Sequence, residues 1–354
     1  MIERVVDIGG RAVHIAGDDA DGYVDNLPDA IHETALDCAT VLLADDAVIL
    51  DVGANVGVLA IGFAHVAPRG RVIAVEPSPR AFPYLVRNLE AAGLPAVDTL
   101  QVAASDASGT LEFVDVDWFS AGSFVKSESI PSEIDILVAN TKVPAEPLDS
   151  IVERLGLDRV DFVKLDVEGH ELQAIRGAAS TFRRFRPTAV IESNLFTATC
   201  FGNTLPFDFL GNIRAVFPYV YDFDRSLGLL PIADEHAVYS AVQRQFLAGR
   251  PSDLICRFEP LSDDAQRELA RLTSPTALDA AHEKIEQLTG LLESTHQALS
   301  GARHQLETTG EELAATQQAL DAALADNRSL RDSTSWKLTA PVRRIGTWLG
   351  RGSR

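Results

Sequence analysis

The chain has 354 residues, of which 46% are hydrophobic, so it can bury a large core and is expected to hold more than one structural unit. Its formal net charge of −20 argues against nucleic acid as a partner, because a polyphosphate requires a basic face. The three cysteines are odd in number and widely scattered, so neither a disulfide framework nor a zinc site is expected.

Targeting signals are not evident in the sequence. The N-terminus lacks a basic start followed by an apolar core, and no apolar run approaches the ~20 residues of a membrane-spanning helix. We therefore expect a cytoplasmic protein that is soluble or lies peripherally at the inner face of the plasma membrane.

Strands and helices alternate from residue 47 to about residue 192, which is typical of a parallel sheet. A short strand region and a helix are predicted before it, within residues 1–45. The predicted core strands are 47–52, 71–76, 97–103, 160–165 and 188–192, with helices near 57–67, 79–92, 147–156 and 170–183. A later helix and two strands would complete a seven-stranded sheet with one reversed strand at its edge; they are predicted at 206–217, 219–224 and 254–258.

A turn of small residues joins the first two core strands. The first strand ends at Asp51, the turn contains Gly53 and Gly57, and the second strand ends in Glu76. Glycine allows a tight turn and a close approach of the backbone to a ligand. Glu76 can accept hydrogen bonds from both hydroxyls of a ribose. Strand, glycine turn, helix, strand and acid is the order of a nucleoside site in an open α/β sheet.

The spacing within this turn argues against a dinucleotide. A dinucleotide site needs G-x-G-x-x-G, which leaves room for a pyrophosphate at the helix N-terminus, whereas here Ala54 and Asn55 follow the first glycine. Asp51 would repel a pyrophosphate, but it suits the ammonium and sulfonium groups of S-adenosylmethionine. The turn therefore predicts this cofactor, with a nicotinamide site and a purely structural turn as the weaker alternatives.

Polar residues follow the third predicted strand. Ser105 and Asp106 come directly after it, where the pair could hydrogen-bond the amino group of an adenine. The same residues also fit an ordinary turn. Their position after the strand that ends in Glu76 favours the cofactor-binding interpretation.

The densest charged stretch follows the fourth predicted strand. Lys164 and Asp166 are two positions apart on that strand and so point to one face, and Glu168 follows in the turn. The next strand ends in Glu192. Because the carboxyl ends of parallel strands border the ligand crevice in such folds, we expect these groups at the site.

In this order the motifs resemble the FkbM-type methyltransferase family over roughly residues 45–200. The segments that carry the resemblance are 51–57, 76–77, 103–106, 148–151, 163–171 and 191–192. The resemblance implies an α/β fold of class I, a Rossmann-like seven-stranded sheet with helices on both faces, and S-adenosylmethionine-dependent methylation of a hydroxyl, often on a sugar or polyketide. The predicted cofactor-binding residues are Asp51, Gly53, Ala54, Asn55, Gly57, Glu76, Pro77, Ser105 and Asp106.

Methyl transfer to a sugar hydroxyl requires alignment of the reacting atoms and a base or metal, because that hydroxyl is a very weak acid. The predicted catalytic residues are Asp166, Glu168, His170 and Lys164. The role of His170 stays open, because a small or variable residue is expected there. Asp166 and Glu168 could bind a divalent ion, but the sequence names no third ligand, so no metal site is predicted.

Beyond Pro275 the sequence follows a heptad pattern over about eight repeats. The first seam position is occupied by Leu278, Ile285, Leu292, Leu299, Leu306, Leu313, Leu320 and Asn327. This spacing predicts a coiled coil over residues 276–332 that forms a homo-oligomer or pairs with a partner's helix. A long amphipathic helix folded back on the domain is the alternative.

The C-terminal tail, residues 333–354, contains five basic residues and no acids. Trp336 and Trp348 beside these cations suit the headgroup layer of an anionic membrane, so peripheral membrane contact is expected. The tail resembles those of bacterial surface-polysaccharide glycosyltransferases. A disordered basic tail is the alternative.

The predicted organisation is therefore a methyltransferase domain (1–260), a linker (261–275), the coiled coil and the basic tail. The predicted function is O-methylation of a sugar hydroxyl during synthesis of a cell-surface polysaccharide or glycolipid, with a glycan as acceptor and a glycosyltransferase as a possible partner. One alternative is a scaffold that recruits glycosyltransferases. The other is methylation of a lipid or polyketide hydroxyl.

Overall fold

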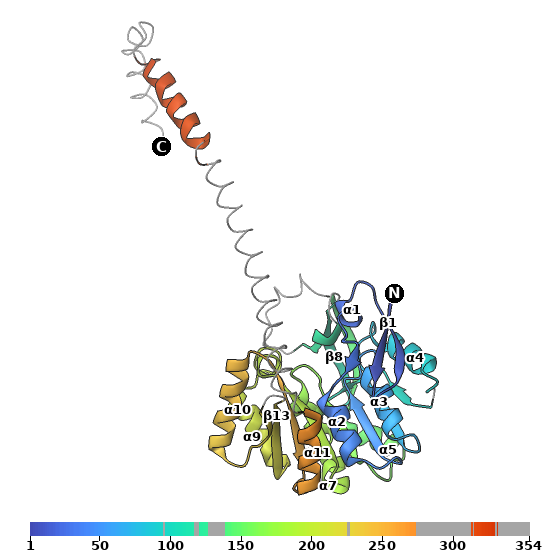
Figure 1. Ribbon diagram of the computed structural model, residues 1–354. Coiled ribbons are helices and arrows are strands. Elements are labelled where there is room, and N and C mark those ends of the chain that lie inside the picture. The colour runs from blue at the N-terminus through green and yellow to red at the C-terminus, as the bar shows by residue number, and fades with distance from the viewer. Residues whose placement is uncertain are drawn as a thin grey trace. The chain divides into compact units, whose positions relative to one another are not determined.

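The computed structural model describes residues 1–94, 96–116, 120–126, 139–224, 227–273, 313, 315–329 and 331. The chain divides into two units, Met1–Pro275 and Thr276–Arg354. Figure 1 shows the helices and strands of the first unit. All the strands described below belong to the first unit.

The first unit is built on a mixed sheet of eight strands in the order β14-β13-β15-β12-β11-β4-β5-β6. Five neighbouring strands are parallel, namely β6 (Asp98–Leu100), β5 (Arg71–Val75), β4 (Val48–Val52), β11 (Phe162–Leu165) and β12 (Thr188–Ser193). Three more strands extend the sheet beyond β12, namely β15 (Ser252–Arg257), β13 (Tyr219–Asp224) and β14 (Gly228–Pro231).

The predicted number of strands and the number of reversed strands both need correction. Two strands run opposite to the others. β15 pairs antiparallel with β12 on one side and with β13 on the other, so it lies inside the sheet, and β14 is the second reversed strand. The eighth strand, β14, folds back on β13 as a hairpin and forms the edge. Pro231 ends β14, at an edge where proline's missing N–H is tolerated.

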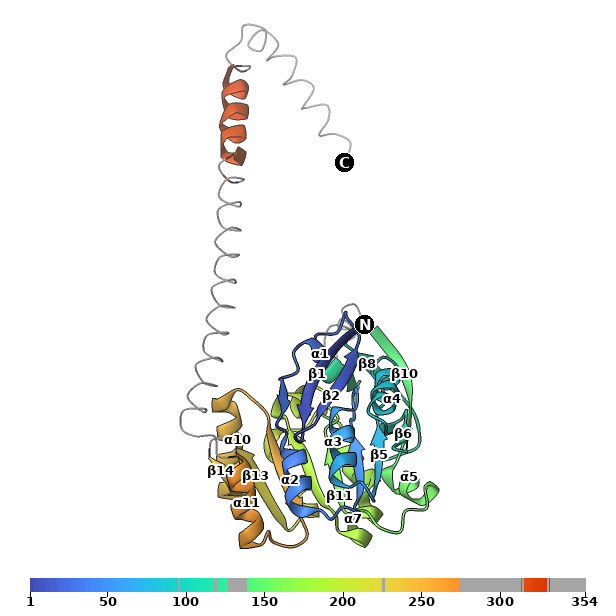
Figure 2. The ribbon, with the colours of Figure 1, turned by 45° about the vertical axis from the view of Figure 1, so that its right-hand side comes forward.

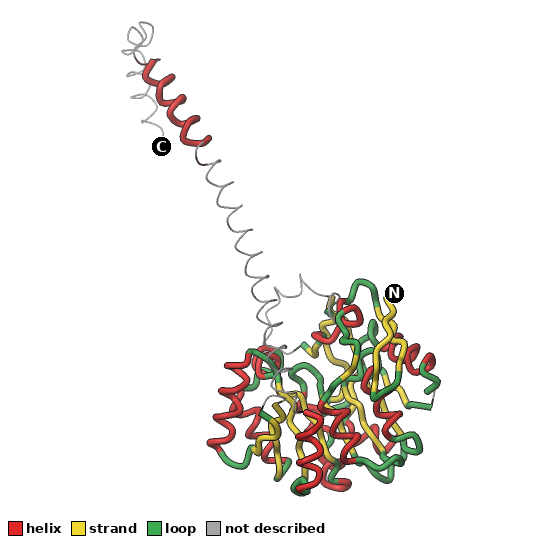
Figure 3. Tube along the Cα trace, viewed as in Figure 1, coloured by secondary structure: helices red, strands yellow, loops and turns green. Residues whose placement is uncertain are grey.

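Helices cover both faces of this sheet (Figure 3). Ile49 and Leu50 are neighbours on β4 and face opposite sides, so they belong to two separate hydrophobic clusters. One cluster includes α2 (Thr34–Leu42), α3 (Val58–Val66), α4 (Phe82–Ala91) and α11 (Asp263–Thr273). The other includes α5 (Leu148–Arg154), α6 (Glu171–Gly177), α7 (Ala179–Phe185), α8 (Leu195–Cys200), α9 (Pro206–Val216) and α10 (Glu235–Ala248). Burial on both faces explains the continuous apolar runs of the central strands.

Two smaller sheets stand beside the main one. The N-terminal sheet has the order β2-β1-β3 and contains β1 (Ile2–Ile8), β2 (Ala12–Gly17) and β3 (Ala30–Ile31), with the short helix α1 (Gly22–Asp25) between β2 and β3. The other has the order β7-β10-β8-β9 and contains β7 (Ala103–Ala104), β8 (Gly109–Asp115), β9 (Phe124–Val125) and β10 (Ala139–Glu146). A 3-10 turn, η1 (Ser120–Gly122), precedes β9 and contacts α1. Figure 2 shows α1, the β1–β2 hairpin and β8 close together above the main sheet.

Several predicted elements have different limits in the structure. The strand predicted over 97–103 is divided, because β6 joins the main sheet whereas β7 pairs with β10. The helix predicted over 170–183 is two helices, α6 and α7, which meet at Ala178. The predicted linker at 261–275 is also corrected, because α11 occupies most of it and contacts α2. Leu261 and Leu269 are buried there, so the first unit continues to Pro275.

In the second unit the structure describes little beyond residues 315–329, which are helical. Leu320 and Leu324 on this helix are 52% and 47% exposed. The heptad residues from Leu278 to Leu306 and the basic tail at 333–354 lie outside the described residues, so the coiled coil and the membrane contact stay predictions. In the described part of the chain, no helix is both long enough and apolar enough to cross a membrane.

Candidate functional site

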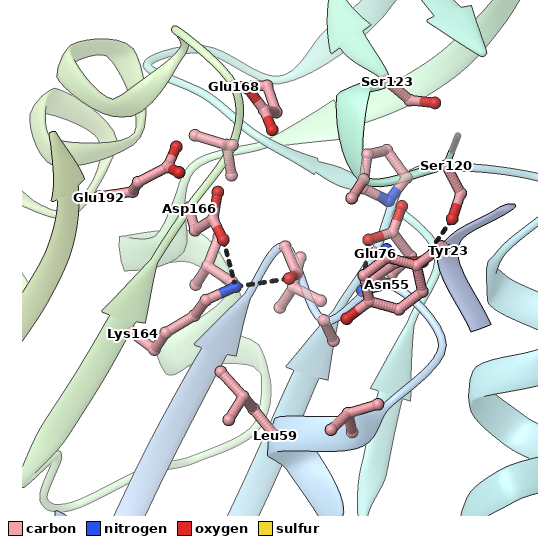
Figure 4. A pocket seen from close by; sticks show the side chains of 18 of the residues that line it. Tyr23, Asn55, Leu59, Glu76, Ser120, Ser123, Lys164, Asp166, Glu168 and Glu192 are labelled. Atoms are coloured by element: carbon pink, nitrogen blue, oxygen red, sulfur yellow. Dashed lines mark hydrogen bonds and ion pairs between the residues drawn. The ribbon is translucent and has the colours of Figure 1, made fainter. Parts of the chain in front are cut away.

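A cavity of about 480 Å³ lies at the carboxyl ends of β4, β5, β11 and β12, a volume that suits a small-molecule ligand (Figure 4). Its lining includes three residues of the β4–α3 turn, two that follow β5, four from the end of β11 and the turn after it, and one from β12. They are Gly53, Ala54, Asn55, Glu76, Pro77, Lys164, Asp166, Glu168, His170 and Glu192. The structure thus brings together most of the residues that the sequence predicts for the site.

The turn after β4 is shaped by Gly53, whose φ is +81°. Its N–H donates to the Val75 carbonyl oxygen at 2.9 Å, which ties the turn to β5. A Cβ at this position would lie 1.8 Å from the backbone oxygen of Asp166. Glycine is therefore required because the ends of β4 and β11 meet here, and not only because a ligand approaches.

Gly57 has a similar structural reason. Its φ is +93°, and a Cβ there would lie 2.7 Å from Cδ1 of Leu85 on α4. Gly57 does not line the cavity, whereas Gly53, Ala54 and Asn55 of the same turn do. Its role is to let α3 begin close to α4.

Glu76 is held in place by two backbone donors. The Asn55 N–H donates to its Oε2 and the Ser78 N–H donates to its Oε1, each at 2.8 Å. Burial raises the pKa of Glu76 to about 7, although these two hydrogen bonds favour the charged form. The carboxylate lines the cavity next to the glycine turn, as the sequence predicts for a group that accepts ribose hydroxyls.

Asp51 does not reach the cavity. It is completely buried, and its Oδ1 lies 3.9 Å from Nζ of Lys164. Neither carboxylate oxygen has a hydrogen-bond partner among the described residues, and burial raises the pKa of Asp51 to about 6. Asp51 is thus buried next to Lys164, and its predicted contact with the ammonium group of the cofactor stays a prediction.

Ser105 and Asp106 also lie outside the cavity lining, and their predicted contact with adenine stays a prediction. The Ser105 hydroxyl lies 3.0 Å from Nε2 of His170, and Asp106 pairs with Arg176 at 3.4 Å. The preceding residues, 102–104, line the cavity instead and give it an apolar wall. The sequence predicted that residues at this strand end contribute to the site. The residues there that line the cavity are 102–104 rather than 105 and 106.

Lys164 joins the glycine turn to Asp166 at the end of β11. Its Nζ donates to the Gly53 carbonyl oxygen at 2.7 Å and lies 3.3 Å from Oδ2 of Asp166 (Figure 4). Burial disfavours the ammonium, but Asp166 and Asp51 keep the pKa of Lys164 above its ordinary value. The hydrogen bond to Gly53 and the ion pair with Asp166 hold the Lys164 ammonium between the turn and the acidic residues of the cavity.

Three carboxylates gather at one end of the cavity. One oxygen from each of Asp166, Glu168 and Glu192 lies within 4.8 Å of the others. Glu168 has a φ of +50°, a conformation that is uncommon for residues other than glycine. Burial raises the pKa of Glu168 to about 8, with Asp166 and Glu171 adding to the effect, and burial also raises that of Glu192. The third carboxylate comes from β12, because β11 and β12 are neighbours in the sheet.

His170 lines the cavity in its neutral form. Burial lowers its pKa to about 4, so the imidazole carries no charge near neutral pH. The Ser105 hydroxyl at its Nε2 fixes the ring. Glu171 supports the same turn, because its Oε1 accepts the N–H groups of Val167 and Gly169 at 3.1 Å each. Burial raises the pKa of Glu171 to about 7.

Other lining residues were not found from the sequence. Tyr23, Glu33 and Ser120 come from segments outside the strand–helix alternation. The Ser120 hydroxyl donates to Oδ1 of Asn55 at 3.2 Å, so the η1 turn closes the cavity from the side opposite the three acids (Figure 4). These residues carry no motif, and only the folded chain brings them to the site.

Comparison with known proteins finds a match to the family described as "Methyltransferase FkbM domain" over residues 51–227. The chain is 26% identical to the 2-O-methyltransferase NoeI of Sinorhizobium fredii, over 51% of this chain and 76% of that protein. It is 28% identical to the hexuronic acid methyltransferase AglP of Haloferax volcanii, over 39% of this chain and 53% of that protein. In most of the curated relatives that it matches, the chain spans less than two thirds of the relative's length.

Among solved structures, a precorrin-6y C5,15-methyltransferase from Geobacter metallireducens matches with a TM-score of 0.34 and 16% identity. The match covers 69% of this chain and 96% of that one.

Proposed function

Because the chain belongs to the FkbM methyltransferase family, we propose that it is an S-adenosylmethionine-dependent O-methyltransferase that acts on a sugar hydroxyl. The observation that supports this most directly is the layout of the cavity. Glu76 and the glycine turn lie at one end, and the carboxylates of Asp166, Glu168 and Glu192 lie at the other (Figure 4).

The first end suits the nucleoside part of the cofactor. Each Glu76 oxygen accepts one backbone N–H and retains a lone pair that can accept a ribose hydroxyl. Val102 and Ala103 contribute apolar surface for a flat ring, and Asn55 presents its side chain to the same space. When bound, S-adenosylmethionine supplies a methyl group on a sulfonium; as the methyl carbon bonds to oxygen, the carbon–sulfur bond breaks, its electrons stay on sulfur, and the hydroxyl releases one proton.

The second end suits the acceptor. Carboxylates accept hydrogen bonds from hydroxyl groups, so the rim can orient a sugar. Asp166, whose side chain is 37% exposed, can take the released proton, and Lys164 fixes its orientation. The neutral His170 ring completes the wall and is too weak a base to compete at neutral pH.

The choice of a sugar acceptor is supported by two of the relatives, one named as a 2-O-methyltransferase and the other as a hexuronic acid methyltransferase. We extend the proposal to a glycan that is assembled for the cell surface, on the cytoplasmic side of the membrane. The heptad repeat would supply self-association or a glycosyltransferase partner, and the basic tail would supply contact with the membrane.

Mass spectrometry of reactions with sugar nucleotides and oligosaccharides tests the proposal. The full chain with S-adenosylmethionine should add one methyl group to a sugar hydroxyl. Asp166→Asn should slow transfer by ~100-fold or more, the usual range for loss of a general base, while S-adenosylhomocysteine still binds. Glu153→Gln, on the exposed face of α5, is the matched control and should be fully active. A chain that binds the cofactor but methylates no hydroxyl would favour the scaffold alternative.

A further inference from the structure

The three carboxylates at the acceptor end come from separate places in the chain and converge. Asp166 ends β11, Glu168 lies in the following turn in a left-handed conformation, and Glu192 lies on β12. Their oxygens approach within 4.8 Å of one another, close enough for one ion to contact all three. All three side chains also line the cavity, so an ion there would be open to a ligand.

The second observation concerns Glu192. Its Oε2 is buried and has no hydrogen-bond partner among the described residues. A buried, unpaired carboxylate oxygen is costly unless something compensates its charge. In the described part of the chain the ion pairs do not reach Glu192 or Glu168, because Lys164 pairs with Asp166 and Asp51 only. Glu168 and Glu192 therefore have no cationic protein partner among the described residues.

We propose that Asp166, Glu168 and Glu192 bind a hard divalent cation of the Mg²⁺ class. Three carboxylates form an all-oxygen ligand set, which Mg²⁺, Mn²⁺ and Ca²⁺ prefer, whereas zinc prefers nitrogen and sulfur ligands. His170 does not belong to this ligand set, since its Nε2 faces the Ser105 hydroxyl. Three ligands leave about three positions of an octahedral ion free.

The chemical role of this cation rests on the proposed function, namely methyl transfer to a hydroxyl. Because all three carboxylates line the cavity, the free positions of a bound cation would be open to oxygen atoms of the acceptor. A cation at this place would lower the pKa of an acceptor hydroxyl. Because each residue offers the cation one oxygen, the second oxygen of Asp166 stays available to take the released proton as the oxygen–methyl bond forms. The bonds that form and break are those of the proposed reaction, and no further reactant is needed. The cation would thus fix which hydroxyl is methylated as well as activate it.

Manganese binding tests the site without cofactor or acceptor. The full chain, treated with EDTA and dialysed, is titrated with Mn²⁺ and followed by electron paramagnetic resonance. We expect one saturable site per chain, from which Mg²⁺ displaces the Mn²⁺. Glu192→Gln should weaken Mn²⁺ binding by roughly tenfold or more, because it removes one of three charged ligands. Glu153→Gln, a surface glutamate on α5, should bind as the wild type does.

Two results would overturn the site, namely the absence of saturable binding and equal Mn²⁺ binding by the wild type and Glu192→Gln. Calorimetric titration with S-adenosylhomocysteine shows whether each variant is folded. If Glu192→Gln does not fold, Glu168→Gln takes its place.

The same titration separates the cation site from the proposed function. Cofactor binding without Mn²⁺ binding rejects the cation site alone, whereas Mn²⁺ binding without cofactor binding rejects the proposed function and leaves the site intact.

Discussion

At the scale of single residues, the floor of the cavity depends on Gly53. Its positive φ and the closeness of the Asp166 backbone oxygen both exclude a side chain. Gly93 has a similar φ of +74° but open space around it, and Gly211 lies on the exposed face of α9 without neighbours within 4 Å. Alanine at Gly53 would suffer both a backbone clash and an unfavourable φ, at Gly93 only the unfavourable φ, and at Gly211 neither. Comparison of the three separates the free-energy cost of the clash from that of the backbone conformation.

We expect Gly53→Ala to destabilise the domain most, by ~3 kcal/mol or more, since strain of 1–3 kcal/mol adds to a backbone clash. Gly93→Ala should cost about 1 kcal/mol, because only the left-handed conformation is penalised. Gly211→Ala should stabilise the domain by ~0.5–1 kcal/mol, because alanine favours a helix. Urea denaturation of the three variants measures these differences. Equal stability of Gly53→Ala and Gly93→Ala would show that the contact with Asp166 is not rigid.

A residue of the site could be predicted from the sequence where the strand and turn pattern alone places it beside the cavity. Glu76 was found because it ends a buried strand directly opposite a glycine turn, and the structure joins the two through the Asn55 N–H. The surroundings of the Asp51 and Ser105 side chains could not be predicted, because a side chain at a strand end can face the ligand or the protein. That choice is made by partners distant in sequence, here Lys164 and His170.

At the scale of elements, the central strands could be predicted because burial on both faces makes their sequences continuously apolar. The strands of the β7-β10-β8-β9 sheet could not, since β8 is exposed over most of its first half and pairs with a strand distant in sequence. Helix α11 was missed for another reason. It is charged overall, and one of its few apolar residues, Leu269, is completely buried.

The heptad segment makes its own prediction at this scale. Leucines on a helix that are 47–71% exposed are expected to be covered by another chain, as in a coiled coil. Analytical ultracentrifugation of the full chain should therefore show an oligomer, and residues 1–275 alone should sediment as a monomer. Leu320→Lys, in the seam, should weaken association, whereas Gln318→Lys, outside it, should not. A monomeric full chain would support the helix that folds back on the domain.

At the scale of the whole molecule, the chain combines a methyltransferase unit of about 275 residues with a C-terminal unit of different composition. The strongly acidic balance of the chain is concentrated before the basic tail at residues 333–354. The central claim concerns the first unit alone, namely that Glu76 binds the nucleoside of the cofactor in the cavity above β4 and β5.

Calorimetric titration of the full chain with S-adenosylhomocysteine at pH 8 and pH 6 tests this claim most directly. The pKa of Glu76 is raised to about 7, so the carboxylate is mostly charged at pH 8 and mostly protonated at pH 6, where it accepts hydroxyls less well. We expect one site per chain whose affinity falls as the pH is lowered. Glu76→Gln should weaken binding at pH 8 by roughly tenfold or more and reduce the pH dependence, because hydrogen bonds to a charged group contribute ~1.5–3 kcal/mol. Glu153→Gln should behave as the wild type. No binding, or equal affinity of Glu76→Gln and the wild type at both pH values, would contradict the account.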